Sequence, residues 1–185
     1  MRTPALLLVA IAALGLTGCG DHNLVLRVDV LSYLEDWQRH IVVASVPGGS
    51  VPVPVSIVPD TTINLIEGLS GVAKVRSVTI SLGGQVTVAS GSGSGRFKVY
   101  LSDESTDPLT TLPVMDVPVQ FSAGSPATVN AEAAGDPAVA ELFTRPRLRL
   151  AVVIDSAMVA PPGASDLTVT LGRLEAVVIA GRKAF

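Results

Sequence analysis

The sequence predicts an all-β fold: a single β-sandwich, immunoglobulin-like or jelly-roll-like, with one or two short helices. Three observations predict it. Apolar and polar residues alternate with period two through most of the chain, as in strands with one buried face. The alternating segments are short, and Gly, Pro, Asp or Ser residues separate them. With 48% hydrophobic residues and one cysteine, the chain must gain its stability from a packed core.

The strands are expected at short intervals along the chain. The first follows from the alternation of Leu24, Leu26 and Val28 with Val25 and Arg27, which places the two sets on opposite faces. Further segments with strand character are 40–46, 51–58, 61–66, 72–82, 85–90, 96–101, 114–121, 127–131, 147–154 and 167–180. Seven to ten strands in two packed sheets are therefore expected.

Pro52 and Pro54 lie on one face of their segment. Because proline has no N–H to donate to a neighbouring strand, this segment is expected at a sheet edge or as an extended polyproline-like piece.

Two segments near the end of the chain predict the state of the core. Their inner faces carry mid-sized branched side chains with no wide gap of glycines: Leu148, Leu150, Val152, Ile154, Leu167, Val169 and Leu171. Such faces interdigitate between packed sheets, so a filled core is expected.

One helix is well marked. Asp136 can cap its N-terminus, Pro137 suits its first turn, and Val139, Leu142 and Phe143 fall on one face. We expect it to close one end of the sandwich.

Tyr33 and Trp37 lie four residues apart in segment 33–38, which is expected to form a second helical turn. Rings beside hydrogen-bonding groups can bind sugars, and such groups flank them: Glu35, Asp36 and Arg39. Aromatic residues make up only 4% of the chain, which favours the alternative that these rings fill the core. Its aromatic members would be Trp37, Phe97, Phe121 and Phe143.

The first 19 residues have the layout of an export signal. Arg2 gives a positive start, and residues 5–16 form an apolar run too short to span a bilayer. Residues 16–19, Leu-Thr-Gly-Cys, fit the lipobox pattern at every position. The segment resembles that of a bacterial lipoprotein precursor. The resemblance implies cleavage after Gly18 and diacylation of Cys19 on sulfur as the mature N-terminus.

An ordinary secretory signal peptide would share the positive start and the apolar run, so Cys19 distinguishes the two. As the only cysteine it cannot form an internal disulfide, and a free thiol outside the cytoplasm would be reactive. We therefore expect a lipoprotein signal peptide at 1–18, a lipidated tether at 19–23 and a β-sandwich domain at 24–185. Gly20 to Asn23 span about 14 Å at most, which places the domain close to the membrane.

Charge and hydropathy exclude some partners. The chain has 13 basic and 16 acidic residues, a net charge of −3, which argues against nucleic acid. No second apolar run approaches the roughly 20 residues of a membrane helix. Attachment to the membrane is therefore expected through Cys19 alone.

Two motifs resemble catalytic or phosphate-binding elements. Residues 90–95, Ser-Gly-Ser-Gly-Ser-Gly, lead into an expected strand and not a helix, so they predict a flexible hairpin tip and not a phosphate loop. His22 and His40 are the only histidines. They form no zinc pattern, and a Ser-His-Asp apparatus would have to use one of them. Both are expected on the surface, and no cofactor or metal is predicted.

Asp103, Glu104 and Asp107 crowd one expected turn. Loop carboxylates of this kind can bind calcium, but the spacing lacks the order of an EF-hand, and a solvated turn is the simpler interpretation.

Arg147 and Arg149 share the outer face of an expected strand. They could contact anionic headgroups or a sugar phosphate. The alternative is an ordinary solvent-exposed face of an amphipathic strand.

The leading functional hypothesis is a non-enzymatic structural or binding module of the bacterial cell envelope, with envelope proteins or glycans as partners. A carrier of an acyl chain is the alternative and requires a hollow interior. An extracytoplasmic enzyme requires His40 or a carboxylate pair in a cleft. Gly20 follows the cysteine where inner-membrane lipoproteins of enteric bacteria carry aspartate, so the resemblance implies the outer membrane in a host with two membranes.

Overall fold

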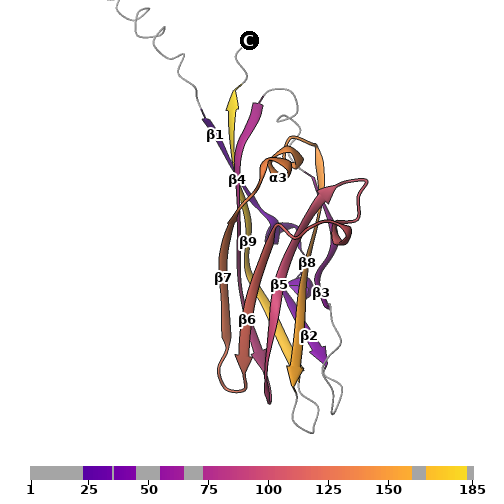
Figure 1. The fold of residues 1–185 in the computed structure, drawn as a ribbon, viewed down its shortest axis with the longest axis vertical. Coiled ribbons are helices and arrows are strands. Elements are labelled where there is room, and N and C mark those ends of the chain that lie inside the picture. The colour runs from indigo at the N-terminus through magenta and orange to yellow at the C-terminus, as the bar shows by residue number, and fades with distance from the viewer. Residues whose placement is uncertain (1–22, 35, 45–54, 65–72, 160–165, 183–185) are drawn as a thin grey trace, which may run out of the picture.

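Two β-sheets pack face to face in the computed structural model of the chain (Figure 1). It describes residues 23–34, 36–44, 55–64, 73–159 and 166–182. Sheet A contains β1 (Asn23–Asp29), β2 (His40–Ala44), β4 (Ala73–Val88), β7 (Ala127–Ala134) and β9 (Asp166–Arg182). Sheet B contains β3 (Val55–Asn64), β5 (Ser92–Asp103), β6 (Met115–Ser122) and β8 (Arg147–Val159). The predicted all-β sandwich is confirmed.

The strand order is that of a jelly roll. Sheet A has the order β1-β9-β4-β7, with β2 also paired to β9, and sheet B has the order β3-β8-β5-β6. The antiparallel pairs are nested along the chain: β5 with β6, then β4 with β7, then β3 with β8, and finally β1 and β2 with β9. Nested pairs rolled into two sheets make a jelly roll. Of the two expected topologies, the jelly-roll one is therefore formed.

β4 and β9 are the longest strands, with 16 and 17 residues, and they pair along almost their whole length. The prediction of two strands, at 72–82 and 85–90, is therefore wrong, since both belong to β4. Likewise, the predicted strands at 51–58 and 61–66 join in β3 over the described residues. β3 is an edge strand of sheet B, but Pro52 and Pro54 lie outside the described residues.

Gly83 and Gly84 explain how β4 continues without a turn. The pairing register with β9 shifts between these two residues, which is a β-bulge. A Cβ on Gly84 would lie only 2.7 Å from the backbone oxygen of Thr170, and one on Gly83 would lie 3.0 Å from Cβ of Arg173. Because glycine has no Cβ, the two backbones can approach this closely.

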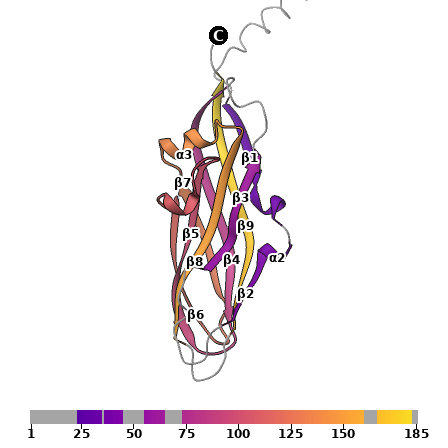
Figure 2. The same ribbon diagram turned by 90° about the vertical axis from the view of Figure 1, so that its right-hand side faces the viewer.

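β1 and β2 share one edge of β9. β1 pairs with residues 175–181 of β9 and β2 with residues 166–170. Between them, η1 (Val30–Tyr33) and α2 (Asp36–Arg39) leave the sheet at the side of the sandwich near β3 (Figure 2). The helical turn predicted at 33–38 thus becomes two shorter turns.

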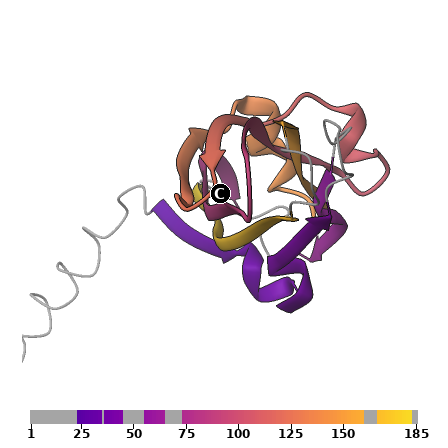
Figure 3. The same ribbon diagram turned by 90° about the horizontal axis from the view of Figure 1, so that it is seen from below.

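The inner faces of both sheets form one core, which the two sheets enclose when the molecule is viewed along its long axis (Figure 3). The side chains predicted to line it are at most 3% exposed: Leu148, Leu150, Val152, Ile154, Leu167, Val169 and Leu171. A void among the inner side chains of the described strands has a volume of about 10 Å³, about one water molecule. The side chains around this void are therefore closely packed.

The aromatic part of the core prediction is correct for three residues and wrong for the fourth. Phe97, Phe121 and Phe143 are buried, whereas Trp37 is 62% exposed. Trp37 lies on α2 at the side of the sandwich. The side chains buried there are those of Val30 and Leu34, both 4% exposed. The ring therefore faces outward.

The predicted helix is confirmed as α3 (Pro137–Leu142), which connects β7 in sheet A to β8 in sheet B. The backbone N–H of Val139 donates to the carboxylate of Asp136 at 2.8 Å, which is the expected cap. Val139 and Phe143 are buried in the core. The helix thus covers the sandwich where β7 ends and β8 begins.

The expected hairpin tip at 90–95 is shorter than predicted. β4 ends at Val88 and β5 begins at Ser92, so the turn covers only residues 89–91. Gly91 adopts a φ of 81°, a conformation that favours glycine. Residues 92–95 instead pair with β6 and β8 on both sides, because the neighbouring strands supply hydrogen bonds that the sequence alone does not reveal.

Replacement of Val152 by aspartate should unfold the domain. Val152 has no exposed surface and pairs with Val99 in the middle of sheet B. An unpaired carboxylate in a packed interior costs several kcal/mol, against a total stability of about 5 to 15 kcal/mol. Val42→Asp, at a 62% exposed position on β2, is the matched control. Circular dichroism and thermal unfolding compare them, and equal melting temperatures would contradict the packed interior.

The Gly84→Ala variant should lose about 1 to 3 kcal/mol of unfolding free energy, because the added methyl group collides with backbone that cannot easily move. Gly172→Ala is the control, since a Cβ at Gly172 meets nothing within 4 Å. Denaturant titration measures both variants. Equal losses would show that close approach at the bulge is not the reason for glycine.

Candidate functional site

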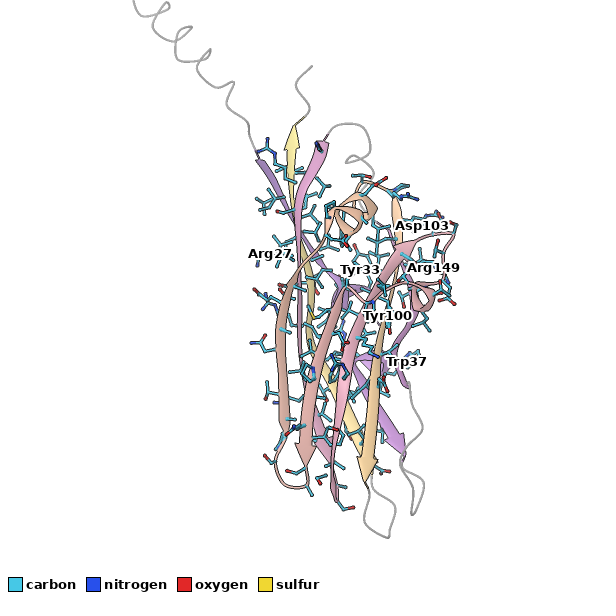
Figure 4. The ribbon with its side chains drawn as sticks, in the orientation of Figure 1. Arg27, Tyr33, Trp37, Tyr100, Asp103 and Arg149 are labelled. Atoms are coloured by element: carbon cyan, nitrogen blue, oxygen red, sulfur yellow. The ribbon has the colours of Figure 1, made fainter. Side chains whose placement is uncertain are left out.

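Arg149 is bound to a carboxylate that no sequence pattern had indicated. Its guanidinium binds both oxygens of Asp60 on β3, with the Nε–Oδ1 distance being 2.8 Å. Its Nη1 also donates to the backbone oxygen of Thr106 at 3.1 Å. Figure 4 shows Arg149 and Asp103 near the same end of the sandwich. The register of β3 shifts between Val58 and Thr61, and this irregularity contains Asp60.

The neighbouring arginines have acidic partners in the turn after β5. Arg147 Nη1 donates to Glu104 Oε1 at 2.8 Å, and Arg145 Nη1 lies 3.4 Å from Asp103 Oδ2. Arg147 and Arg149 lie on the outer face of β8, as the alternation predicts, with Leu148 buried between them. Because carboxylates already neutralise these guanidiniums, the cluster suits a structural role better than the binding of an anionic headgroup or sugar phosphate.

The turn after β5 is held by its own side chains. Asp103 Oδ1 accepts hydrogen bonds from the hydroxyl of Ser105 at 2.7 Å and from its backbone N–H at 2.9 Å. The hydrogen bond from the Ser105 hydroxyl, followed by one from Thr106, lowers the pKa of Asp103 below its ordinary value. Asp107 accepts from the backbone N–H of Leu109 at 2.9 Å and caps η2 (Pro108–Thr110).

The calcium hypothesis finds little support in this geometry. Asp103, Glu104 and Asp107 each bind a different partner, so their oxygens do not converge. Over the described ranges, no three His, Cys, Asp or Glu residues come together in a way that could hold a metal ion.

A cleft of about 370 Å³ lies between α3 and the connection from β5 to β6. Leu112, at its border, is 87% exposed, and Leu109 on the same connection is 50% exposed. Most of the lining side chains are apolar: Leu101, Leu112, Pro113, Val114, Ala134, Ala138, Val139 and Leu142. The volume is at the small end of the range for ligand pockets. The cleft can therefore accept an apolar side chain or a small ligand.

The polar side chains of the cleft hold the local backbone. Ser102 Oγ donates to the carbonyl oxygen of Thr106 at 2.6 Å, and Thr111 Oγ1 donates to that of Pro108 at 2.7 Å. Asp136 caps α3. Sequence reasoning missed the cleft, because its two walls are about 30 residues apart in the chain and neither wall carries a motif.

His40 lies on β2, which pairs with residues 166–170 of β9, at the end of the sandwich away from α3 (Figure 1). Its exposed ring has Nδ1 3.2 Å from Thr170 Oγ1. His40 is thus not placed beside the hydroxyl and carboxyl groups of the cleft. His22 lies outside the described residues.

Tyr33 and Trp37, the candidate glycan-binding rings, are 50% and 62% exposed, and the turns that carry them, η1 and α2, lie on the same side of the sandwich (Figure 2). Arg39, which the sequence analysis grouped with them, instead binds backbone carbonyl oxygens. Its Nη2 donates to the carbonyl oxygens of Leu31 at 2.6 Å and Leu34 at 3.2 Å. The rings are therefore accessible, and glycan binding stays a prediction.

Cys19 and Gly18, the residues of the expected processing site, lie outside the described residues. The structure does describe the strand that follows them. β1 pairs with β9 from Asn23 opposite Gly181 to Asp29 opposite Glu175. No helix among the described residues has the length and apolar character that crossing a bilayer requires.

Comparisons with known proteins add no family. No family model and no curated protein matches the chain. Structures of infectious bursal disease virus are among the solved structures that resemble it: the Gx strain at 17% identity and the Gt strain at 16%, both with a TM-score of 0.39. The match covers 89% of this chain but only 37% and 38% of those chains. At this TM-score the likeness carries no argument, so the fold rests on the strand order.

The lowered pKa of Asp103 predicts a pH-dependent contribution to stability. A carboxylate whose pKa is lower in the folded than in the unfolded state stabilises the fold above its unfolded value of about 4. This stabilisation is lost as the pH falls through the folded value. Asp103→Asn should therefore destabilise the protein at about pH 7 and much less at about pH 2.5. Denaturant titrations at both pH values measure the difference.

Ser105→Ala removes the principal hydrogen-bond donor and should weaken the same pH dependence. An equal loss of stability at both pH values in Asp103→Asn would contradict the assignment.

Proposed function

We propose that the chain is a lipid-anchored extracytoplasmic protein of the bacterial cell envelope with a non-enzymatic structural or binding role. The observation that carries this proposal is residues 16–19, Leu-Thr-Gly-Cys, directly after an apolar run with a positive start. Acyl chains on Cys19 would hold the protein on the membrane, where a single chain would bind only marginally.

The start of the fold supports this proposal. β1 begins at Asn23, four residues after Cys19, and β9 holds β1 in sheet A. A tether of four residues reaches about 14 Å at most. An acylated Cys19 would therefore keep the jelly roll next to the bilayer, and partners would have to approach it there.

The cleft beside α3 provides the surface for a binding role. Its apolar lining and the exposed Leu112 at its border suit a hydrophobic side chain of an envelope protein. The exposed rings of Tyr33 and Trp37 are the alternative surface and suit a glycan.

Two observations weigh against the other hypotheses. A carrier of an acyl chain needs a hollow interior, whereas the void described in the core holds about 10 Å³. An enzyme needs converging reactive groups, whereas the hydroxyl and carboxyl groups of the cleft bind nearby backbone and His40 lies elsewhere. For the location we propose the outer membrane in a host with two membranes, because Gly20 follows Cys19.

In a bacterial host, Cys19→Ser should accumulate as a precursor without acyl mass, whereas the wild type should lose residues 1–18 and gain the acyl chains. The serine hydroxyl cannot replace the thiol as the site of lipid transfer. Membrane fractionation and mass spectrometry of the intact protein measure both effects. Thr17→Ala, which keeps a small residue in the motif, is the matched control and should be processed as the wild type. A wild-type protein that carries no lipid, or is cleaved elsewhere, would contradict the proposal.

A further inference from the structure

The outer face of sheet A carries apolar and basic residues at the end where β1 begins. Val25 of β1 is 59% exposed and pairs with Ile179 of β9, and Arg27 pairs with Val177. The alternate residues of β9 are buried toward the core: Ala176, Val178 and Ala180. Val177 and Ile179 therefore lie on the outer face with Val25 and Arg27. Lys74 of β4, opposite Gly181, extends this surface, which we call the anchor-end face.

The outward positions of the anchor-end face nearest to the start of β1 carry basic side chains and no acidic one. They are Arg27 of β1 and Lys74 of β4, whereas the next outward pair along β1 and β9, Asp29 opposite Glu175, is acidic. The whole chain has a net charge of −3. Positive charge thus lies at the end of this face nearest to Asn23, in a protein whose net charge is negative.

Arg27 and Lys74 also differ from the other basic side chains in their partners. Seven basic side chains of the described part lie within 4 Å of a carboxylate oxygen: Arg39, Arg96, Lys98, Arg145, Arg147, Arg149 and Arg173. Within the same part of the chain, no carboxylate pairs with Arg27 or Lys74. Both side chains are exposed, and Figure 4 shows Arg27 at the outer side of sheet A. Their charge is therefore available to an external anion.

The length of the tether indicates which anionic surface Arg27 and Lys74 would face. Asn23 lies within about 14 Å of Cys19, and Val25 lies only about 7 Å further along β1. An acylated Cys19 would sit at the membrane surface, so the anchor-end face would be the part of sheet A nearest to the lipid headgroups.

We propose that the anchor-end face lies on the anionic phospholipid surface that holds the acyl chains of Cys19. Val25 and Ile179 contact the boundary between headgroups and acyl chains, and Arg27 and Lys74 contact lipid phosphates. Each basic residue near such a surface contributes about a fivefold preference for the bound orientation. This inference rests on the lipid anchor proposed above. It fixes the orientation of the domain, with sheet A toward the membrane and sheet B away from it.

Spin labels on the acylated, full-length protein test this orientation. Acylation consumes the only native thiol, so Val25→Cys and Gln120→Cys each introduce a single labelling site. Gln120 is exposed on β6, in sheet B. The proteins are placed on vesicles of phosphatidylglycerol and phosphatidylethanolamine, and collision rates with oxygen and with a water-soluble nickel chelate are measured. The label at Val25 should be more accessible to oxygen and less to nickel than the label at Gln120.

Charge reversal tests the role of the basic residues. Arg27→Glu combined with Lys74→Glu should reduce the membrane-contacting population of the Val25 label by at least about twentyfold. High salt or vesicles without phosphatidylglycerol should reduce it as well. Arg96→Glu combined with Lys98→Glu changes the net charge equally on sheet B and should leave the Val25 label in contact with lipid. Thermal unfolding of each variant shows whether it is folded.

The outcomes are distinct. Absence of acyl mass overturns the lipid anchor and this inference with it. An acylated protein whose Val25 label is as accessible to nickel as the Gln120 label overturns this inference alone. A Val25 label shielded from both reagents indicates that a protein or a second copy of the chain covers the face, and it also overturns the inference.

Discussion

The pairing of β9 is the interaction on which the rest of the structure depends. β9 pairs with β4 on one side, from Ala73 opposite Arg182 to Val88 opposite Leu167, and with β1 and β2 on the other. Without β9, the first two strands would have no place in sheet A. These contacts join the two ends of the described chain, so a large loop must close before they form, and such topologies fold slowly.

The pairing of β1 with β9 also affects how charged residues are distributed over the two sheets. Because β1 is fixed against the end of β9, the chain enters the folded sheet at Asn23, so the lipid anchor proposed at Cys19 would act directly on the jelly roll. The opposite sheet has a different surface. There Arg147 and Arg149 of β8 pair with Glu104 and Asp60, and Arg145, just before β8, pairs with Asp103. Paired charges of this kind add little stability at an exposed site, but they neutralise the surface. Among the described residues, Arg27 and Lys74, which pair with no carboxylate, lie on sheet A at the end where β1 begins.

Particular residues show how far sequence reasoning reached. The alternation of Leu148, Leu150, Val152 and Ile154 correctly predicted an inner face, because burial on one side of a strand leaves a local period of two. Asp136 was correctly predicted as a cap, since its partner is three residues away. Gly83 and Gly84 were wrongly predicted to separate two strands. They allow the backbone of β9 to approach closely, and β9 lies far along the chain. Trp37 was placed in the core because aromatic residues are scarce in the chain, whereas its position on α2 at the side of the sandwich leaves it exposed. Asp60 gave no local signal, since its partner Arg149 is 89 residues away.

By itself the sequence determined the β-rich class, the positions of most strands and the helix after Asp136, because local patterns of a few residues encode each of these features. The acylation of Cys19 stays a prediction. Only the tertiary structure decided the jelly-roll order, the merging of neighbouring strands, the cleft beside α3 and the placement of Arg27 and Lys74 on the anchor-end face. The physical reason is the same in each case. Strand partners are chosen by packing between segments far apart in the chain, and an alternating pattern says which side of a strand is buried but not which strand lies beside it.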